Sequence, residues 1–596
     1  MTSTIKKRSE LVQGDTWRLE DIFANDEAWE AAYAACRASV QAFSGRQGTL
    51  GMRDSLLAAL RDYYAAIRDV SALFAYAKMR RDEDNTLARY QALTDRATTL
   101  SVEFSTVSSF MTPELIALPP AYLAECAADP AFADYRMFFT AIERARPHTL
   151  SAAEERIVAM AGELGAAPGV IFDMLTDADM KFPEVPDGKG GMAPLTHGSY
   201  IHHMMSGDRA VRKAAFTAMY ETFKGFSATV PAVYAASVKG DLFSARAAKF
   251  GGALEASLYQ NDVPRSVYES LIEAVHRHLP ALDELMRFQA ERLGLADPAM
   301  YDAYARMPGD FAIDLPFREA YDLVVEALAP LGADYQAVLR RALDERWIDP
   351  YENEGKSSGA YSWGTYETHP YVLMNYHETL EDLLTIAHEM GHSLHTYLSA
   401  SHQPAPMAEY SLFVAEVAST VNEVLVMMHL LDRHPEKNAQ SYLLNNLLQA
   451  YRTTLFRQTM FAEFEKASHE MAEKGDALTA ENLNALYASL NQAYYPSLEQ
   501  TDLIQYEWMR IPHFYSAFYV YQYATGFSAA MAIAGMIREE GASAVARYKE
   551  FLSAGGSLYP IDALKLAGVD MSTPQPVEKA LGMFEELLAR YKNAVE

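Results

Sequence analysis

Cysteine is scarce in this chain, which has only Cys36 and Cys126 among its 596 residues. Two thiols cannot build a disulfide framework, and a chain of this length does not need one. A short basic cluster at residues 6–8 is not followed by an apolar segment, so the sequence predicts no secretory signal. We therefore expect a cytoplasmic protein.

Basic residues are also few, with 51 Lys and Arg against 79 Asp and Glu, which gives a formal net charge of -28. This balance opposes binding to nucleic-acid phosphates or to an anionic membrane. Residues 511–537 lack charged side chains and are long enough to span a bilayer. They nevertheless contain Pro512, His513 and several tyrosines, whose polar groups would need partners in lipid. We predict a fully buried helix there, and neither a nucleic-acid nor a membrane partner.

Apolar residues recur at helical spacing through most of the chain. The clearest early stripe consists of Trp29, Tyr33, Cys36, Val40 and Phe43. Residues 182–195 break this pattern with three prolines and three glycines, which favours a short hairpin or loop and a domain boundary. We therefore predict an N-terminal helical domain over residues 1–195 and a second, mostly helical domain over residues 196–596.

A small β element is predicted within the second domain. Residues 371–376 are rich in aromatic and β-branched side chains and follow Pro370, which is typical of a strand. Its edge could accept an extended peptide as an additional strand. Residues 355–363 are predicted to be a loop, and the chain is predicted to be helical from Thr379 almost to its end. The expected fold class is mainly α.

The strongest chemical signal is His388-Glu389-Met390-Gly391-His392. The surrounding apolar stripe predicts a helix, and Thr379 with Asp382 has the spacing of a capping box. Residues four apart on a helix share one face, so both imidazoles can reach one metal ion. Glu389 would then stand beside a metal-bound water and could take its proton during attack on a carbonyl carbon.

The third ligand decides the kind of metal site. His395 and Leu398 stand where metzincins require a glycine and a histidine, which excludes that class. His395 is too far along the helix to share an ion with His388, so we expect it to hydrogen-bond near the site. Glu416, in a second apolar helix predicted over residues 412–431, is the expected third ligand, with an exposed acid or a member of a core ion pair as the alternative. Three protein ligands leave one position open, as in a catalytic zinc site with one Zn²⁺ per chain.

Two further features leave alternatives open. Glu423 lies two helical turns beyond Glu416 and would be either a hydrogen-bond acceptor for a ligating histidine or a solvated acid. His513 precedes Tyr515, Tyr519 and Tyr523, which recur at one-turn steps. Such a row could stabilise an oxyanion, or it could consist of ordinary core tyrosines.

Together, these motifs resemble oligoendopeptidase F within the thimet oligopeptidase and neurolysin-like family of zinc metallopeptidases. The resemblance covers essentially the whole chain. Its segments are residues 17–23, 195–200, 369–376, 388–395, 413–420 and 511–526. It implies an elongated, multi-helical, neurolysin-like body with a deep substrate channel and one zinc ion.

The resemblance also assigns roles to individual residues. His388, His392 and Glu416 match the metal ligands, Glu389 the general base and His513 the histidine on the oxyanion side. Phe518 stands where a strict count places a tyrosine. Tyr519 and Tyr523 are therefore the candidates for the oxyanion-stabilising tyrosine.

The resulting hypothesis is a zinc metalloendopeptidase that hydrolyses internal bonds of short oligopeptides by metal-activated water attack. One alternative is a peptidyl-dipeptidase that releases dipeptides from chain ends. Another is a peptide-binding protein without turnover, although binding alone would not need Glu389. Short peptides are the expected partners, and the sequence predicts no particular oligomeric state.

Overall fold

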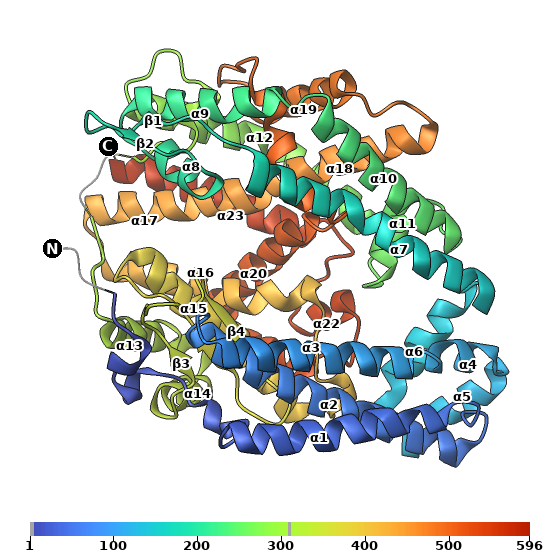
Figure 1. Ribbon diagram of the computed structural model, residues 1–596. Coiled ribbons are helices and arrows are strands. Elements are labelled where there is room, and N and C mark those ends of the chain that lie inside the picture. The colour runs from blue at the N-terminus through green and yellow to red at the C-terminus, as the bar shows by residue number, and fades with distance from the viewer. Residues whose placement is uncertain (1–4, 308–310, 596) are drawn as a thin grey trace. The chain divides into compact units, whose positions relative to one another are not determined.

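The computed structural model describes residues 5–307 and 311–595, of which most are helical (Figure 1). About 72% of the residues are in helices and 2% in strands, which confirms the mainly α fold class. Contacts divide the chain into two compact units. The first unit comprises residues 1–147, 312–429 and 533–569, and the second comprises residues 148–311, 430–532 and 570–596. This partition differs from the predicted division after residue 195, which stays a prediction, as do the elongated shape and the substrate channel.

The first unit contains three N-terminal long helices, a small sheet and the helix that carries the His-Glu motif. Its elements are α1 (Asp26–Phe43), α2 (Arg53–Glu83), α3 (Ala88–Ser108), α4 (Met111–Ala117), α5 (Pro120–Ala128), α6 (Arg136–Ala145), α13 (Phe317–Ala327), α14 (Ala333–Asp344), β3 (Ile348–Asp349), β4 (Tyr361–Trp363), β5 (Tyr371–Leu373), α15 (Leu380–His402), α21 (Ala542–Ala554) and α22 (Pro560–Leu566).

The second unit is built from helices and one short hairpin. Its elements are α7 (Ala152–Asp173), β1 (Val185–Pro186), β2 (Met192–Ala193), α8 (His197–Met204), α9 (Arg209–Lys224), α10 (Thr229–Ala247), α11 (Ala253–Tyr259), α12 (Arg265–Arg292), α17 (Lys437–Ala450), α18 (Arg457–Lys474), α19 (Ala480–Tyr494) and α23 (Gln575–Val595). Two helices, α16 (Leu412–Arg433) and α20 (Tyr521–Glu540), have residues in both units.

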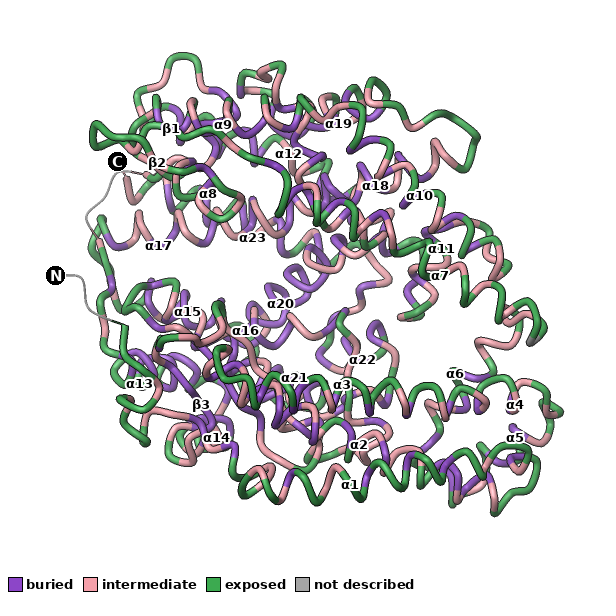
Figure 2. The backbone as a smooth tube through the Cα atoms, viewed as in Figure 1, coloured by how far each residue is buried: buried purple, intermediate pink, exposed green. Residues whose placement is uncertain are grey.

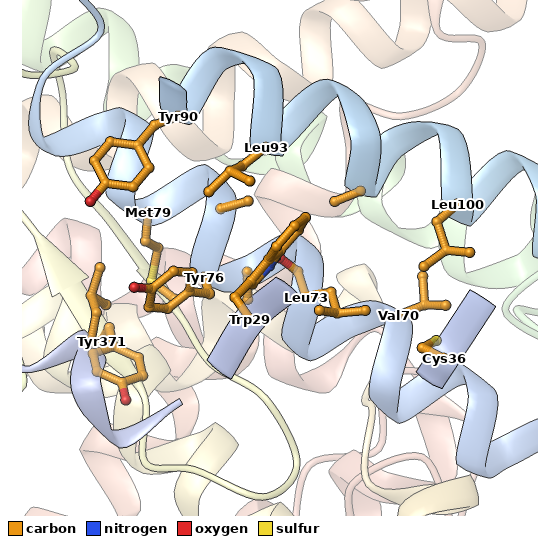
Figure 3. Close-up of a cluster of buried hydrophobic side chains, with 14 of the residues drawn as sticks. Trp29, Cys36, Val70, Leu73, Tyr76, Met79, Tyr90, Leu93, Leu100 and Tyr371 are labelled. Carbon is orange, nitrogen blue, oxygen red and sulfur yellow. The ribbon is translucent and has the colours of Figure 1, made fainter. Parts of the chain in front are cut away.

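Packing of α1 against α2 and α3 forms a core of the first unit (Figure 3). The predicted stripe on α1 supplies Trp29 and Cys36 to this core, and Tyr371 of β5 closes one end of it. The indole nitrogen of Trp29 donates a hydrogen bond to the backbone carbonyl of Leu73 at 2.9 Å, so its polar atom is satisfied within the core. Both cysteines are buried free thiols, as a structural role predicts.

Buried charges fasten the N-terminal segment to this unit. The fully buried carboxylate of Asp349 in β3 accepts hydrogen bonds from Arg8, at 2.8 Å for Oδ1, and pairs with Lys356 at 2.7 Å. Glu83 at the end of α2 receives a second bond from Arg8 at 3.0 Å and one from the Trp17 indole at 2.7 Å. Each buried carboxylate here therefore has cationic partners. We call these residues the Asp349 network.

The small sheet has the strand order β3-β5-β4. β5 pairs in parallel with β3 and antiparallel with β4, with Val372 opposite Ile348 and Ser362. The prediction of a strand is confirmed for residues 371–373, but its proposed free edge is wrong, because both edges are occupied. β4 forms within the segment predicted to be a loop and lies against α15, where the hydroxyls of Ser362 and Ser393 are 2.8 Å apart.

The segment over residues 511–537 is only partly helical as predicted. α20 begins at Tyr521 and is largely buried (Figure 2). The residues before it form a 3₁₀ helix, η13 (Pro512–Tyr515), followed by a turn in which Phe518 has a φ of 57°. A β-carbon in the left-handed region is strained, so this turn needs support from elsewhere. The predicted hairpin is confirmed by the pairing of β1 with β2.

Two segments among the described helices are long and apolar enough to cross a membrane, by length and composition alone. They are Ala153–Asp179 and Leu412–Arg433. The second is α16, most of whose apolar window is buried, as in a core helix. Residues 153–179 are mostly exposed.

Candidate metal centre

α15 begins where the sequence predicts and presents both motif histidines. The hydroxyl of Thr379 accepts the backbone N–H of Asp382 at 3.1 Å, and the Asp382 carboxylate accepts from the Thr379 hydroxyl and backbone, which completes a capping box. The helix then places His388 and His392 one turn apart with their Nε2 atoms 3.1 Å from each other.

Glu416 from α16 completes a group that could hold a metal ion. Its Oε2 lies 3.3 Å from Nε2 of His388 and 3.4 Å from Nε2 of His392. A tetrahedral zinc ion with bonds of about 2.0–2.1 Å holds its ligand atoms about 3.3 Å apart. The three donor atoms therefore already have the spacing of three corners of such a tetrahedron, and two imidazoles with one carboxylate are a donor set that suits zinc.

A close approach of two helix backbones brings Glu416 to the histidines. A β-carbon on Gly391 would lie 2.5 Å from Cα of Ser419 and 2.6 Å from the carbonyl oxygen of Ala418. Only glycine allows α15 and α16 to cross at this distance. The amide of Asn422 on α16 adds a hydrogen bond to the carbonyl of Ala387 at 3.0 Å.

Glu423 orients the first histidine. Nδ1 of His388 lies 2.6 Å from Oε1 of Glu423, so the structure favours the hydrogen-bond acceptor over the solvated acid. A proton held on Nδ1 by a carboxylate leaves the lone pair of Nε2 directed at the metal position. Burial by itself lowers the pKa of His388, but the hydrogen bonds to Glu416 and Glu423 outweigh it and raise the pKa to about 10.

The two remaining carboxylates of the site differ in their electrostatics. Burial raises the pKa of Glu416, but the two histidines outweigh it and hold the pKa well below its usual value, so this ligand is ionised. Burial raises the pKa of Glu389, whose side chain is 6% exposed. Its Oε2 has no hydrogen-bond partner among the described residues. An unsatisfied buried oxygen beside the metal group fits a residue that binds a water proton.

His395 lies outside the metal group. It is buried and stacks on the ring of Tyr410, with centroids 3.6 Å apart and planes 4° apart. Burial lowers the pKa of His395 to about 3, and its Nδ1 has no hydrogen-bond partner among the described residues. The hydrogen bond predicted for His395 is therefore not formed at Nδ1, and the ring packs on Tyr410.

The candidate oxyanion residues form a separate cluster in the second unit. Nε2 of His513 lies 3.3 Å from the hydroxyl of Tyr523, and the rings of Tyr519 and Tyr523 are 5.3 Å apart in an edge-to-face arrangement. Burial lowers the pKa of His513, which favours its neutral form. Tyr515 instead stacks on Phe172, so the structure brings together three of the four predicted residues.

A buried carboxyl group supports the turn between His513 and α20. Oε1 of Glu465 in α18 accepts the backbone N–H of Phe518 at 3.1 Å, at the residue with positive φ. Glu465 is fully buried, its Oε2 lacks a partner among the described residues, and burial raises its pKa well above the usual value. No sequence signal distinguished Glu465, because it follows Glu463 and directly precedes Lys466, as an exposed helix acid would.

A mainly helical fold with a His-His-Glu group and a buried free carboxyl beside it defines a protein with a candidate catalytic metal centre. Comparison with protein families then identifies the class. The model of peptidase family M3 matches residues 202–583, and the model described as Oligopeptidase F matches residues 114–182. The chain therefore belongs to peptidase family M3, and peptides are its class of substrate.

Individual relatives agree over the full length. Oligopeptidase PepF of Bacillus subtilis is 42% identical over 98% of this chain and 87% of its own. Group B oligopeptidase PepB of Streptococcus agalactiae is 40% identical over 99% of this chain and 98% of its own. The crystal structure of oligoendopeptidase-F from Enterococcus faecium is 34% identical, with a TM-score of 0.74 over 96% of this chain and 99% of its own. The resemblance seen in the sequence is thus confirmed.

Proposed function

We propose that this protein is a zinc metalloendopeptidase that hydrolyses internal bonds of short oligopeptides. The observation that carries the proposal is the group of His388, His392 and Glu416 at ligand spacing, with the buried and unpartnered Oε2 of Glu389 next to it. The names of its relatives, oligopeptidase and oligoendopeptidase, support the same activity.

In the first unit, three residues would bind the metal ion and a fourth would transfer protons. His388, His392 and Glu416 would hold one zinc ion, which would supply a Lewis acid that makes water nucleophilic at neutral pH. Glu423 fixes the tautomer of His388. Glu389 accepts the proton of the attacking water at Oε2 and returns it to the leaving amine. Its raised pKa suits a group that must both take and give a proton near neutrality.

The cluster of His513, Tyr519 and Tyr523 is proposed to stabilise the negatively charged oxygen of the reaction. Its support is the sequence resemblance and the contact of His513 with Tyr523. The metal group lies in the first unit and this cluster in the second. Kinetics must therefore decide whether they act on the same substrate. Loss of one oxyanion donor typically costs about 10²–10³ in kcat.

The first experiment measures cleavage of an internally quenched peptide of about eight residues by wild type, chelator-treated and zinc-restored enzyme, and by Glu389→Gln. Zinc-dependent cleavage that falls by about 10² or more in Glu389→Gln supports the mechanism. Glu381→Gln is the matched control, because Glu381 is an exposed acid in the first turn of the same helix. A wild-type protein that binds zinc and peptide but cuts no peptide of a varied set would instead be a binding protein.

The cutting mode is tested with peptides whose C-terminus is amidated. An endopeptidase cuts them internally, whereas an enzyme that releases C-terminal dipeptides requires the free carboxylate. Mass spectrometry of the products distinguishes the two modes. In the same assay, His513→Gln, Tyr519→Phe and Tyr523→Phe should lower kcat if they act as proposed. Tyr515→Phe, whose ring packs on Phe172, should not. The cytoplasmic location and the absence of nucleic-acid and membrane partners stay predictions from composition.

A further inference from the structure

A residue with a left-handed backbone separates the three candidate oxyanion residues. Phe518 has a φ of 57° and lies after His513 of η13 and before Tyr519 and Tyr523. We call residues 516–520 the Phe518 turn. Because a β-carbon makes this backbone conformation unfavourable, the turn keeps its shape only if groups around it hold Phe518 in place.

Aromatic contacts within the second unit hold the side chain of Phe518. Its ring is buried and lies 4.6 Å from the ring of His469 on α18 and 6.0 Å from the ring of Tyr268 on α12, measured between ring centres. Tyr268 also contacts Tyr521, the first residue of α20, at 5.0 Å. These contacts fix the ring of Phe518 and the start of α20, but they do not satisfy the backbone of the turn.

Glu465 holds the backbone of the turn. Its Oε1 accepts the N–H of Phe518 at 3.1 Å, across 53 positions of sequence. Glu465 is fully buried and has no cation at ion-pair distance within the described part of the chain. Burying a carboxyl group without a cation is costly, so packing alone would favour an apolar side chain at this place on α18. The bond to Phe518 is the interaction that the carboxyl group supplies and an apolar side chain would not.

The turn determines where the two tyrosines meet His513. The hydroxyl of Tyr523 lies 3.3 Å from Nε2 of His513. The rings of His513 and Tyr519 are 6.4 Å apart, with an angle of 19° between their planes. His513 precedes Phe518 in the chain and both tyrosines follow it. A change in the backbone angles of Phe518 therefore moves the tyrosines relative to the histidine.

We propose that Glu465 is a positioning residue for peptide hydrolysis, because its bond to Phe518 fixes the turn that places Tyr519 and Tyr523 beside His513. The proposal rests on the proposed function, in which these three residues stabilise the negatively charged oxygen of the reaction. Glu465 is fully buried, so it acts through the turn and not by contact with the peptide. Groups that stabilise a reacting atom depend on their exact place, and a misplacement of about 1 Å can cost about 10² in rate.

The kinetic test compares two substitutions of Glu465 in the full chain with the internally quenched peptide. Glu465→Leu removes the acceptor at similar side-chain size, and we expect kcat to fall by about 10-fold or more while KM stays near that of wild type. Glu465→Gln keeps a carbonyl oxygen for the N–H of Phe518 and should restore kcat. Glu470→Leu removes a partly exposed carboxylate of the same helix, paired with Lys466 at 3.2 Å, and is the matched control. A wild-type kcat in Glu465→Leu, or an equal loss in Glu465→Gln, overturns the proposal.

A double-mutant cycle distinguishes positioning from a general loss of activity. If Glu465 acts through the tyrosines, Glu465→Leu should lower kcat by a smaller factor in a Tyr519→Phe/Tyr523→Phe protein than in wild type. An equal factor in both proteins overturns the proposal. If the tyrosine substitutions alone leave kcat unchanged, the oxyanion role fails and this proposal fails with it. If they lower kcat and Glu465→Leu does not, this proposal alone fails.

Hydrogen exchange tests the turn without measuring activity. Peptides that cover residues 511–523 should exchange faster in Glu465→Leu than in wild type, whereas Glu465→Gln and Glu470→Leu should exchange as wild type does. Unchanged exchange in Glu465→Leu overturns the role of Glu465 in holding the turn. If Glu465→Leu does not fold, Glu465→Asp keeps the carboxyl group but withdraws it from Phe518 by one methylene. It should lower kcat in the same direction, and a wild-type kcat in Glu465→Asp overturns the proposal.

Discussion

Two clusters of buried charge, one in each unit, differ in how their charges are balanced. In the Asp349 network of the first unit, Lys356 and Arg8 meet Asp349 and Glu83, so each buried charge has a partner from the chain itself. In the second unit, Arg457 pairs with Glu507, whereas the buried Arg452 has no carboxylate at ion-pair distance among the described residues. A network that only holds a fold together is expected to balance its charges.

Breaking the balanced network should have the largest effect on stability. Lys356→Met leaves Asp349 buried with Arg8 as its remaining cation, and we expect a loss of about 3–5 kcal/mol in the free energy of unfolding. Arg452→Met removes a buried charge that has no carboxylate at ion-pair distance among the described residues, so it should cost less than Lys356→Met. Urea unfolding of both variants checks this. Equal losses in the two variants would remove the contrast between the units.

The next largest effect on stability is expected where a buried carboxyl group stays protonated instead of pairing with a cation. Glu465 is fully buried and has no cation at ion-pair distance within the described part of the chain, and its raised pKa favours the protonated form in the folded state. Its stabilising contribution is complete below the unfolded pKa near 4.3 and is lost as pH rises toward the folded pKa.

Glu465→Gln keeps an acceptor for Phe518 but does not titrate. Its stability relative to wild type should therefore grow by up to about 1.4 kcal/mol per pH unit above pH 5. Urea midpoints at several pH values measure this. A difference that stays constant between pH 5 and pH 8 would mean that Glu465 ionises normally.

The metal group extends the comparison, because a bound ion would there supply the counter-charge of the carboxylates. Glu423→Gln weakens the acceptor for Nδ1 of His388, and we expect metal affinity to fall by about 10–100-fold. Competition with a chromogenic chelator measures the affinity. Glu381→Gln on the same helix is the control and should bind as wild type does.

The smallest effect on stability is expected from the removal of an exposed charge. Arg265 and Glu269 form a solvated pair one turn apart on α12. Such pairs contribute less than about 0.5 kcal/mol, so Arg265→Met should shift the urea midpoint only slightly. A loss comparable to that of Lys356→Met would show that burial is not what sets the cost.

Local patterns predicted much of this molecule because they are set by neighbours in sequence. The stripe on α1, the capping box of Thr379 and the shared face of His388 and His392 all follow from helical geometry. Glu416 could be selected because a carboxylate in an apolar helix needs a partner, and it meets the histidines as expected.

The failures arise where distant segments decide the backbone. Helical periodicity predicted a helix through residues 511–520, yet the N–H of Phe518 is taken by Glu465, 53 positions away in sequence. Pro512 was the local signal for a break, because the residue before a proline avoids the α region. β5 was predicted as a strand, but its central place depends on β3 and β4, which pair with it from elsewhere in the chain.

The crossing of α15 and α16 at Gly391 makes the metal group depend on backbone contact more than on side-chain packing. One missing methyl group sets the distance between the helices, and that distance sets where Glu416 stands. Apolar substitutions elsewhere in the core can therefore weaken the unit without moving the ligands, whereas a single added carbon at residue 391 meets the backbone of α16 and pushes the two helices, and with them the ligands, apart. The ligand spacing of this centre and the stability of the surrounding unit therefore respond to different substitutions.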